Sequence, residues 1–510
     1  MKITRNMLNG MPSIPNECGT MPRGCSGQFE SKHMYFDLLR DNLPEEIVIA
    51  SRRYLAEQLQ ATDKLTCDLP DKIDAIGSWI DEKADQVRHQ YREYLNERQA
   101  GAARRYFSNK SHALYFLKAV APTKLVDGAW LYGLTRRWND ARFSSLIKIY
   151  LEELGEGVPN KNHVTIYKKL LATHGCEQWD NLSDEHFVQG AIQLSLAQHA
   201  DHFLPEVIGF NLGYEQPPLH LLITAYELNE LGIDPTYFTL HFTIDNANTG
   251  HAKKSLDGLL DSLPRVNDAD EFFRRVIRGY KLNCLGTCTN TVIESFDLNK
   301  ELIAILGKKS AVGKYVHSDY CRVAGRTINQ WLSDPTQIPA FLANLEEKGW
   351  IKRDQDPQNS RFWKLLQGEK AEMFGVFNSY EKQVIYDWIA GEPKEFDATQ
   401  PSDNKFGTAA FGQRRLTFKA QRLLDTLGKC SERVIPSAAA RGVIRRHAPR
   451  GSTGDDSDDF NIELRTLEEK LTSLTSKEEI MNLLTSLMSP PNHYTEAGLM
   501  ATRIFTKMVG

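Results

Sequence analysis

Two ionisable side chains lie one helical turn apart in residues 237–260, which read YFTLHFTIDNANTGHAKKSLDGLL. Apolar residues recur at helical spacing in this stretch, which predicts a helix packed against a core. His241 and Asp245 are four positions apart, so both project from the same face of that helix. A buried carboxylate needs an ion pair, hydrogen bonds or a metal ion to offset the loss of water. The pattern therefore fits either a His–Asp hydrogen bond in a helical core or a pair of metal ligands.

Three further predicted helices carry a carboxylate or an imidazole on an otherwise apolar stripe. Glu153 ends the stripe of ARFSSLIKIYLEELGEG, and His163 begins the next stripe ten positions later. Glu215 ends the stripe of PEVIGFNLGYEQPP, and Asp127 lies one turn before Trp130 in PTKLVDGAWLYGL. Taken singly, each residue also fits a structural role, such as a helix end for Glu215 or a helix cap for His163.

Together these residues supply carboxylates and imidazoles from separate helices of one bundle. Mixed carboxylate and imidazole ligands suit a pair of iron or manganese ions, with coordination positions left open for dioxygen. The eight cysteines are scattered without a CxxC pair, which argues against zinc or an iron–sulfur cluster and for reduced thiols. A competing mononuclear site is offered by His199, His202 and Glu206, whose spacing places them on one face of a predicted helix.

The elements that must position these side chains are almost all helical. Strand-like alternation is scarce, so the middle of the chain is predicted to be a helical bundle of the all-α class. Helical patterns cover residues 71–107, 114–134, 143–154, 164–171, 187–203, 205–215, 219–231 and 237–260.

The composition excludes several classes of function. The chain has 510 residues, 25% of them charged and 41% hydrophobic, and its net charge of −4 provides no basic field for nucleic acid or anionic lipid. No apolar run reaches the length of about 18 residues that a membrane span needs. The first residues, MKITRNMLNGMPSIP, hold no apolar stretch of signal-peptide length. We therefore expect a cytoplasmic protein that contacts neither membrane nor nucleic acid.

Changes in composition divide the chain into five predicted parts. We expect an N-terminal irregular segment with a long amphipathic helix (residues 1–107), followed by a metal-binding bundle (108–265) and a mostly helical C-terminal domain (266–395). A polar and mobile linker (396–460) and a helical tail (461–510) complete the chain. Within the C-terminal domain, residues 325–363 resemble a helix–turn–helix followed by a small wing.

The motifs LEELGEG with the following His163, GFNLGYEQPP, and YFTLHFTID followed by GHA carry a family resemblance. On them, residues 111–263 resemble the haem-oxygenase-like diiron oxidases and oxygenases, also described as iron-containing redox enzymes. The resemblance implies a haem-oxygenase-like helical bundle, with an additional mostly helical C-terminal domain in this chain. It also implies a ligand set of Glu153, His163, Glu215, His241, Asp245 and His251, with Asp127 as a first-helix carboxylate.

Two positions depart from the family pattern. Asn248 stands where the last histidine is commonly found, and His251 follows three positions later. On an ideal helix His251 lies about 80° around the axis from His241, so it reaches the metal only if Gly250 interrupts the helix. The second departure is Asp127, because family members more often carry glutamate at that place.

The resemblance implies two iron ions, with manganese as the alternative, that activate dioxygen and oxidise a small organic substrate. Glu215 would bridge or clamp the two ions. The expected substrate is an amine or an amino-acid-derived metabolite in a biosynthetic pathway, oxidised by N-oxygenation or by oxidative C–C cleavage. An electron donor is also implied, and a homodimer is compatible with the sequence.

Two alternatives of other classes remain open. The chain could be a non-catalytic helical scaffold or regulator whose winged-helix-like C-terminal domain binds a partner or DNA. It could also bind haem, since the fold is shared with haem-degrading enzymes, although the crowded carboxylates argue against a haem pocket.

Overall fold

The computed structural model describes residues 30–216, 218–244, 250–265, 268–368, 371–391 and 456–509. In these ranges the fold is all-α, which confirms the predicted class. The only strands there are β1 (Arg322–Val323) and β2 (Arg326–Thr327), which pair as a short antiparallel hairpin. None of the helices in these ranges combines the length and the apolar character that a bilayer span requires.

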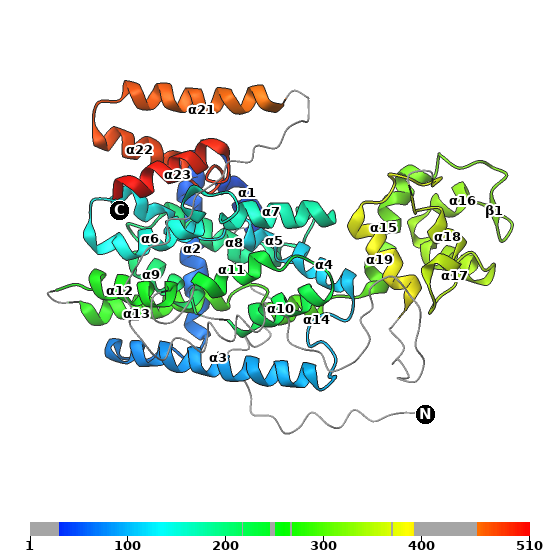
Figure 1. The fold of residues 1–510 in the computed structure, drawn as a ribbon, viewed down its shortest axis with the longest axis horizontal. Coiled ribbons are helices and arrows are strands. Elements are labelled where there is room, and N and C mark those ends of the chain that lie inside the picture. Colours follow the sequence, from blue (N-terminus) through cyan, green and yellow to red (C-terminus); the bar gives the residue numbers. More distant parts are fainter. Residues whose placement is uncertain are drawn as a thin grey trace, which may run out of the picture.

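The larger part of the molecule is a helical bundle (Figure 1). Its α-helices are α1 (Ser31–Leu38), α2 (Glu45–Ala61), α3 (Ile76–Gln99), α4 (Lys110–Ala119), α5 (Ala121–Lys124), α6 (Ser144–Glu153), α7 (His163–His174), α8 (Val188–Gln198), α9 (Leu204–Tyr214), α10 (Leu219–Glu230), α11 (Thr236–Ile244), α12 (His251–Ser262), α13 (Ala269–Lys281) and α14 (Thr289–Glu294). Short 3-10 helices connect several of them: η1 (Thr62–Lys64), η2 (Ile73–Ala75), η3 (Ala129–Arg137), η4 (Ala141–Phe143), η5 (Gly155–Gly157), η6 (Asp184–His186) and η7 (Leu282–Cys284).

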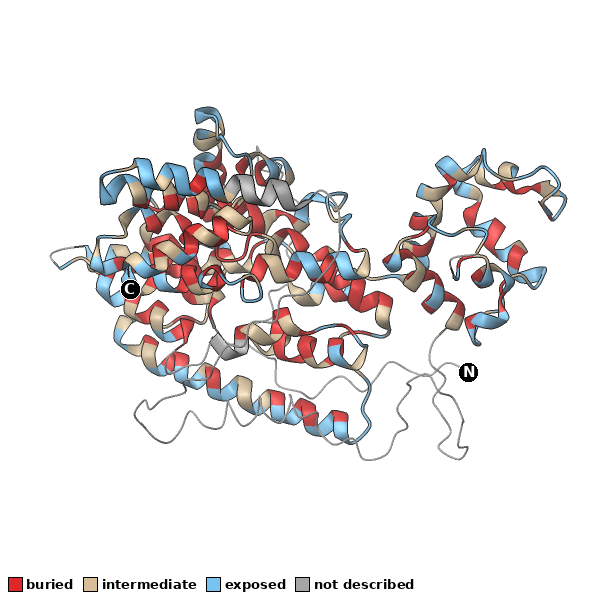
Figure 2. Ribbon diagram, turned by 45° about the horizontal axis from the view of Figure 1, so that its top comes forward, coloured by how far each residue is buried: buried red, intermediate tan, exposed pale blue. Residues whose placement is uncertain are grey.

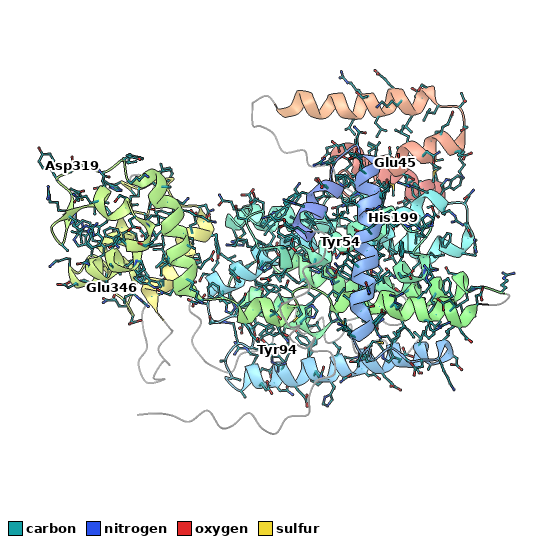
Figure 3. All side chains as sticks on the ribbon, turned by 180° about the vertical axis from the view of Figure 1, so that it is seen from behind. Glu45, Tyr54, Tyr94, His199, Asp319 and Glu346 are labelled. Carbon is teal, nitrogen blue, oxygen red and sulfur yellow. The ribbon has the colours of Figure 1, made fainter. Side chains whose placement is uncertain are left out.

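Helices α1 and α2 were not predicted, although both pack into the bundle. Tyr54 of α2 is fully buried, and its hydroxyl donates to Ser31 Oγ at 3.0 Å. Figure 3 shows α2 running along the back of the bundle, with His199 beside it. The predicted helix over residues 71–107 is shorter in the structure, because α3 covers only Ile76–Gln99.

Two predicted helices are interrupted in the structure, and both interruptions affect the candidate site. The stretch 114–134 divides into α4, α5 and η3, with Asp127 in the turn before η3 rather than on a helix. The stretch 237–260 divides into α11 and α12. Gly250, the N-cap of α12, has an extended conformation with φ −84° and ψ −167°, so the helix is broken before His251.

The C-terminal lobe stands beside the bundle in Figure 1 and has buried residues of its own in Figure 2. Besides the hairpin, it contains α15 (Leu298–Gly313), α16 (Ile328–Leu332), η8 (Pro335–Gln337), α17 (Ile338–Glu347), η9 (Pro357–Asn359), α18 (Arg361–Lys364) and α19 (Ser379–Ala390). The lobe is attached to α4, because Lys118 Nζ lies 2.7 Å from Glu301 Oε1 and the Ser111 N–H donates to Asp387. The division of the chain into domains stays a prediction.

After the lobe the chain returns to the bundle through α21 (Asp456–Ser473), α22 (Lys477–Leu487) and α23 (Glu496–Val509). In Figure 1, α22 and α23 lie against the bundle near α6, and α21 lies outside them. Met481, Leu484, Ala501 and Phe505 are buried in the same hydrophobic cluster as the apolar residues of α6. These helices therefore form part of the bundle core.

Candidate metal centre

Two groups of buried side chains each bring their ligand atoms within 4.8 Å of one another. The first group consists of Asp127, Glu153, His163 and His241, and the second of Glu153, Glu215 and His251. Glu153 belongs to both groups. The resemblance implies that Glu215 bridges or clamps the two ions; in the structure the residue common to both groups is Glu153.

The two oxygens of Glu153 face different partners. Oε2 lies 2.5 Å from Nδ1 of His163, and Oε1 lies 3.3 Å from Nδ1 of His251. A carboxylate with one oxygen in each of two ligand groups can bridge two metal ions, as carboxylates do in diiron helical bundles. The geometry therefore suits a binuclear centre with Glu153 at its middle.

The turn between α6 and α7 brings Glu153 and His163 together. Gly155, Glu156 and Gly157 all have positive φ, at 62°, 52° and 77°, so the LGEG sequence reverses the chain directly after Glu153. A Cβ atom on Gly155 would lie 2.5 Å from the backbone nitrogen of Asn162. Only glycine allows that approach. Asn162 then caps α7 by accepting from the Thr165 N–H at 2.9 Å, and His163 is the first residue of the helix.

Asp127 reaches the site from the turn before η3, and Gly128 makes room for it. A Cβ atom on Gly128 would lie 2.9 Å from Cβ of Glu153. The hydroxyls of Tyr214 and Tyr237 donate to the two oxygens of Asp127 at 2.9 and 2.6 Å. Burial raises the pKa of both tyrosines well above the usual value, so these hydroxyls stay protonated and donate.

Asp127 remains ionised although it is buried. Burial alone would raise its pKa, but the nearby Lys124, His163 and His241 hold the pKa well below the usual value. Lys124 Nζ also donates to the Tyr214 hydroxyl at 3.1 Å. A carboxylate that keeps its charge in the interior is available to a cation.

His241 points Nε2, the ring nitrogen that could bind a metal ion, towards Asp127. Its Nδ1 lies 3.0 Å from the carbonyl oxygen of Tyr237, which can only accept, so Nδ1 carries the proton. In the neutral ring Nε2 then has a free lone pair, and it lies 3.3 Å from Oδ2 of Asp127. A hydrogen bond from the second ring nitrogen to a backbone carbonyl is the usual support of a metal-binding histidine.

His163 provides the clearest test of whether these residues fit a metal ion. Neither ring nitrogen has a hydrogen-bond partner, although Nδ1 lies close to oxygens of both Glu153 and Asp127. The contacts are short but lack hydrogen-bond geometry, as expected of ligands that surround a shared ion. Burial would lower the pKa of His163, but Glu153 and Asp127 raise it to about 10 in the protein without metal. The donor set therefore fits a hard or borderline divalent cation such as Fe²⁺.

His251 is held between three carboxylates at the start of α12. Its Nδ1 lies 2.9 Å from Oε2 of Glu215, and its Nε2 lies 2.9 Å from Oε2 of Glu152. Glu152 also pairs with Lys254, one turn along α12. Burial raises the pKa of Glu152, but His251 and Lys254 bring it below the usual value. Glu152 was not predicted as a site residue, because its only signal in the sequence is its place next to Glu153.

A buried chain of hydrogen bonds also fixes the backbone at His251. Trp130 Nε1–H donates to Oδ1 of Asn211 at 2.9 Å, and Nδ2 of Asn211 donates to Ser255 Oγ at 2.7 Å. The Ser255 hydroxyl donates in turn to the carbonyl oxygen of His251. These contacts join η3, α9 and α12 directly behind the second ligand group.

Asp245 and Asn248 are outside the described residues. The competing mononuclear site is not formed, because α8 ends at Gln198 and α9 begins at Leu204, so His199, His202 and Glu206 do not share a helix. His199 Nε2 instead lies 2.9 Å from Ser51 Oγ, and both oxygens of Glu206 accept from Arg275.

Comparison with known proteins gave one match, which lies within the bundle. Residues 114–283, about a third of the chain, match the family model described as iron-containing redox enzyme, which confirms the resemblance over that segment. The matched segment contains both ligand groups. Comparison with curated proteins and with solved structures gave no match.

Proposed function

We propose that the protein is a non-haem diiron oxidase or oxygenase that uses dioxygen to oxidise a small organic substrate. The observation that carries this proposal is the position of Glu153, whose two oxygens each belong to one of two adjoining ligand groups. A mononuclear site would need only one such group. Manganese fits the same donor types, so the identity of the ions is part of the proposal.

In this proposal Asp127, His163 and His241 would hold one iron, Glu215 and His251 would hold the other, and Glu153 would contribute one oxygen to each group. Two bound ferrous ions supply the electrons that activate dioxygen. Asp245 was predicted as a further ligand from the resemblance, and this also stays a proposal.

Neighbouring residues of the protein fix the orientation of the candidate ligands and exclude bulk water from them. The hydroxyls of Tyr214 and Tyr237 fix both oxygens of Asp127, so that carboxylate cannot rotate away from the ion. Glu152 accepts from Nε2 of His251, which leaves Nδ1 towards Glu153 and Glu215. Every ligand in the two groups is buried, which excludes bulk water from the reacting centre.

The substrate class rests on the family resemblance. We propose an amine or an amino-acid-derived metabolite, oxidised by N-oxygenation or by oxidative C–C cleavage in a biosynthetic pathway, with a separate electron donor. The experiment is to express the protein in iron-supplemented medium and to measure iron per chain. The reduced protein is then mixed with oxygenated buffer in a stopped-flow spectrometer, together with amines, amino acids or fatty acids.

Two irons per chain and a substrate that speeds the decay of the transient absorption would support the proposal. A folded protein that binds no metal would contradict it and would favour a scaffold or regulator. In that case the C-terminal lobe, whose buried residues share one cluster with residues of the bundle, would be the part to test against a partner or DNA.

A further inference from the structure

The C-terminal part of the chain packs against the turn that carries two of the candidate ligands. This region lies outside residues 114–283, the part that matches the family. Met488, at the end of α22, and Phe505, on α23, are fully buried in the same cluster as Tyr150 and Leu154 of the α6 end. A Cβ atom on Gly157 would clash with the carbonyl oxygen of Leu499 and the backbone nitrogen of Arg503. Residues 488–503, called here the C-terminal segment, therefore pack directly against the turn between α6 and α7.

Three polar contacts connect the C-terminal segment to that turn. The Tyr150 hydroxyl, three residues before Glu153, donates to the carbonyl oxygen of Met488. Arg503 Nε–H donates to the carbonyl oxygen of Gly157 at 2.8 Å. The third contact joins Nδ2 of Asn162 to Nδ1 of His493 at 3.1 Å. The contacts thus lie before Glu153, within the turn, and directly before His163.

Asn162 occupies the centre of this arrangement. Its Oδ1 accepts from the Thr165 N–H, so the Nδ2 atom of the side chain faces the other partners and donates to them. The two amide hydrogens reach the carbonyl oxygen of Leu154 at 3.2 Å and Nδ1 of His493. Leu154 directly follows Glu153, and Asn162 directly precedes His163. A single buried amide therefore sets the spacing between two ligands, and His493 holds that amide in place.

We infer that the C-terminal segment is part of the metal centre, with His493 acting as a positioning residue through Asn162. This inference rests on the proposed function, because it concerns the geometry of the same ligands. Without an acceptor at position 493 one hydrogen of the buried Asn162 amide loses its partner, and the bonds to Thr165 and Leu154 alone hold Glu153 close to His163 less firmly. The metal-free protein keeps its fold in that case, but its preformed ion site is lost.

The test measures metal affinity and stability separately on the full chain. His493→Leu removes the acceptor at similar volume, and His493→Asn restores an acceptor oxygen near the position of Nδ1. Anaerobic Co²⁺ titration is followed by visible absorption, and retention of Co²⁺ against a chelator is timed. We expect His493→Leu to bind Co²⁺ about 10–100-fold more weakly, as for other residues that support metal ligands, and His493→Asn to recover most of the loss.

Leu484→Ala is the matched control, because Leu484 is fully buried in α22 and touches none of the three polar contacts. It should lower the urea midpoint of the metal-free protein while leaving Co²⁺ affinity unchanged. Equal losses of affinity in His493→Leu and Leu484→Ala, or no loss in His493→Leu, would overturn the inference.

Asn162→Asp provides a second route if His493→Leu does not fold. It keeps the oxygen that caps α7 and removes both donors, so it should weaken Co²⁺ binding by a similar factor; unchanged affinity would overturn the inference. Failure of the wild-type protein to bind Co²⁺ would instead contradict the proposed function.

Discussion

Replacing Glu153 by glutamine removes the charge that both ligand groups share while keeping the size of the side chain. The pKa of His163 is raised from 6.5 to about 10 in the metal-free protein, which corresponds to about 5 kcal/mol at 1.36 kcal/mol per pKa unit. Glu153 and Asp127 together produce this shift, and Asp127 remains in the variant. Breaking one buried pair in this way should cost the metal-free protein about 3 kcal/mol.

The stability difference between wild type and Glu153→Gln depends on pH. The raised pKa of His163 contributes stability that is complete below pH 6.5 and is lost as the pH rises through 10. The pKa of Glu153 is lowered, because His163 outweighs the effect of burial, so its contribution is present above pH 4.5 and is lost on acidification. The difference between wild type and Glu153→Gln should therefore be largest between pH 4.5 and 6.5 and disappear above pH 10.

The assay combines urea denaturation of the metal-free proteins across this pH range with metal analysis after loading with Fe²⁺. We expect wild type to retain two irons per chain and Glu153→Gln to retain at most one. Glu156→Gln is the control, because Glu156 is exposed and lies only three residues away. Two tightly held irons in Glu153→Gln, or a stability difference that does not change with pH, would refute the bridging role.

Asp127→Asn should lower the iron content from two per chain towards one, because the second ligand group does not include Asp127; retention of both irons would exclude Asp127 as a ligand. At pH 8 the metal-free His163 is protonated, since its pKa is about 10, so Fe²⁺ binding should release about one proton from it. An indicator dye in weak buffer measures this, and no release would contradict the assignment. Glu206→Gln weakens the paired hydrogen bonds with Arg275 and should cost about 2 kcal/mol in urea, with iron content unchanged.

Much of the bundle could be predicted from apolar periodicity alone. The pattern over residues 143–154 corresponds to α6, and that over 164–171 lies within α7. Glu153 and His163 were recognisable because each interrupts an apolar stripe at a helix end. Periodicity reports which face is buried but not where the chain turns, so α4, α5 and η3 were merged into one helix. The turn before η3 depends on Gly128 fitting against Glu153, a contact between distant residues.

The second ligand group was harder to predict for a related reason. His251 was expected about 80° away from His241 on a continuous helix, whereas Gly250 is the extended N-cap of α12 and His251 begins that new helix. The orientation of the His251 imidazole depends on its contacts with Glu215 and Glu152, which come from other parts of the bundle. Glu227 illustrates the opposite case: it is a buried carboxylate, yet it accepts from the N–H groups of residues 105–107 and has a structural role.

The contact between Asn162 and His493 joins residues that are 331 positions apart. Ribosomes add about 5–20 residues per second, so α6 and α7 are synthesised tens of seconds before their covering segment exists. During that interval the turn between Glu153 and His163 lacks its covering segment, and Asn162 has no acceptor at position 493. On the inference made for His493, the order of synthesis completes the ion site only after α22 and α23 have formed and docked.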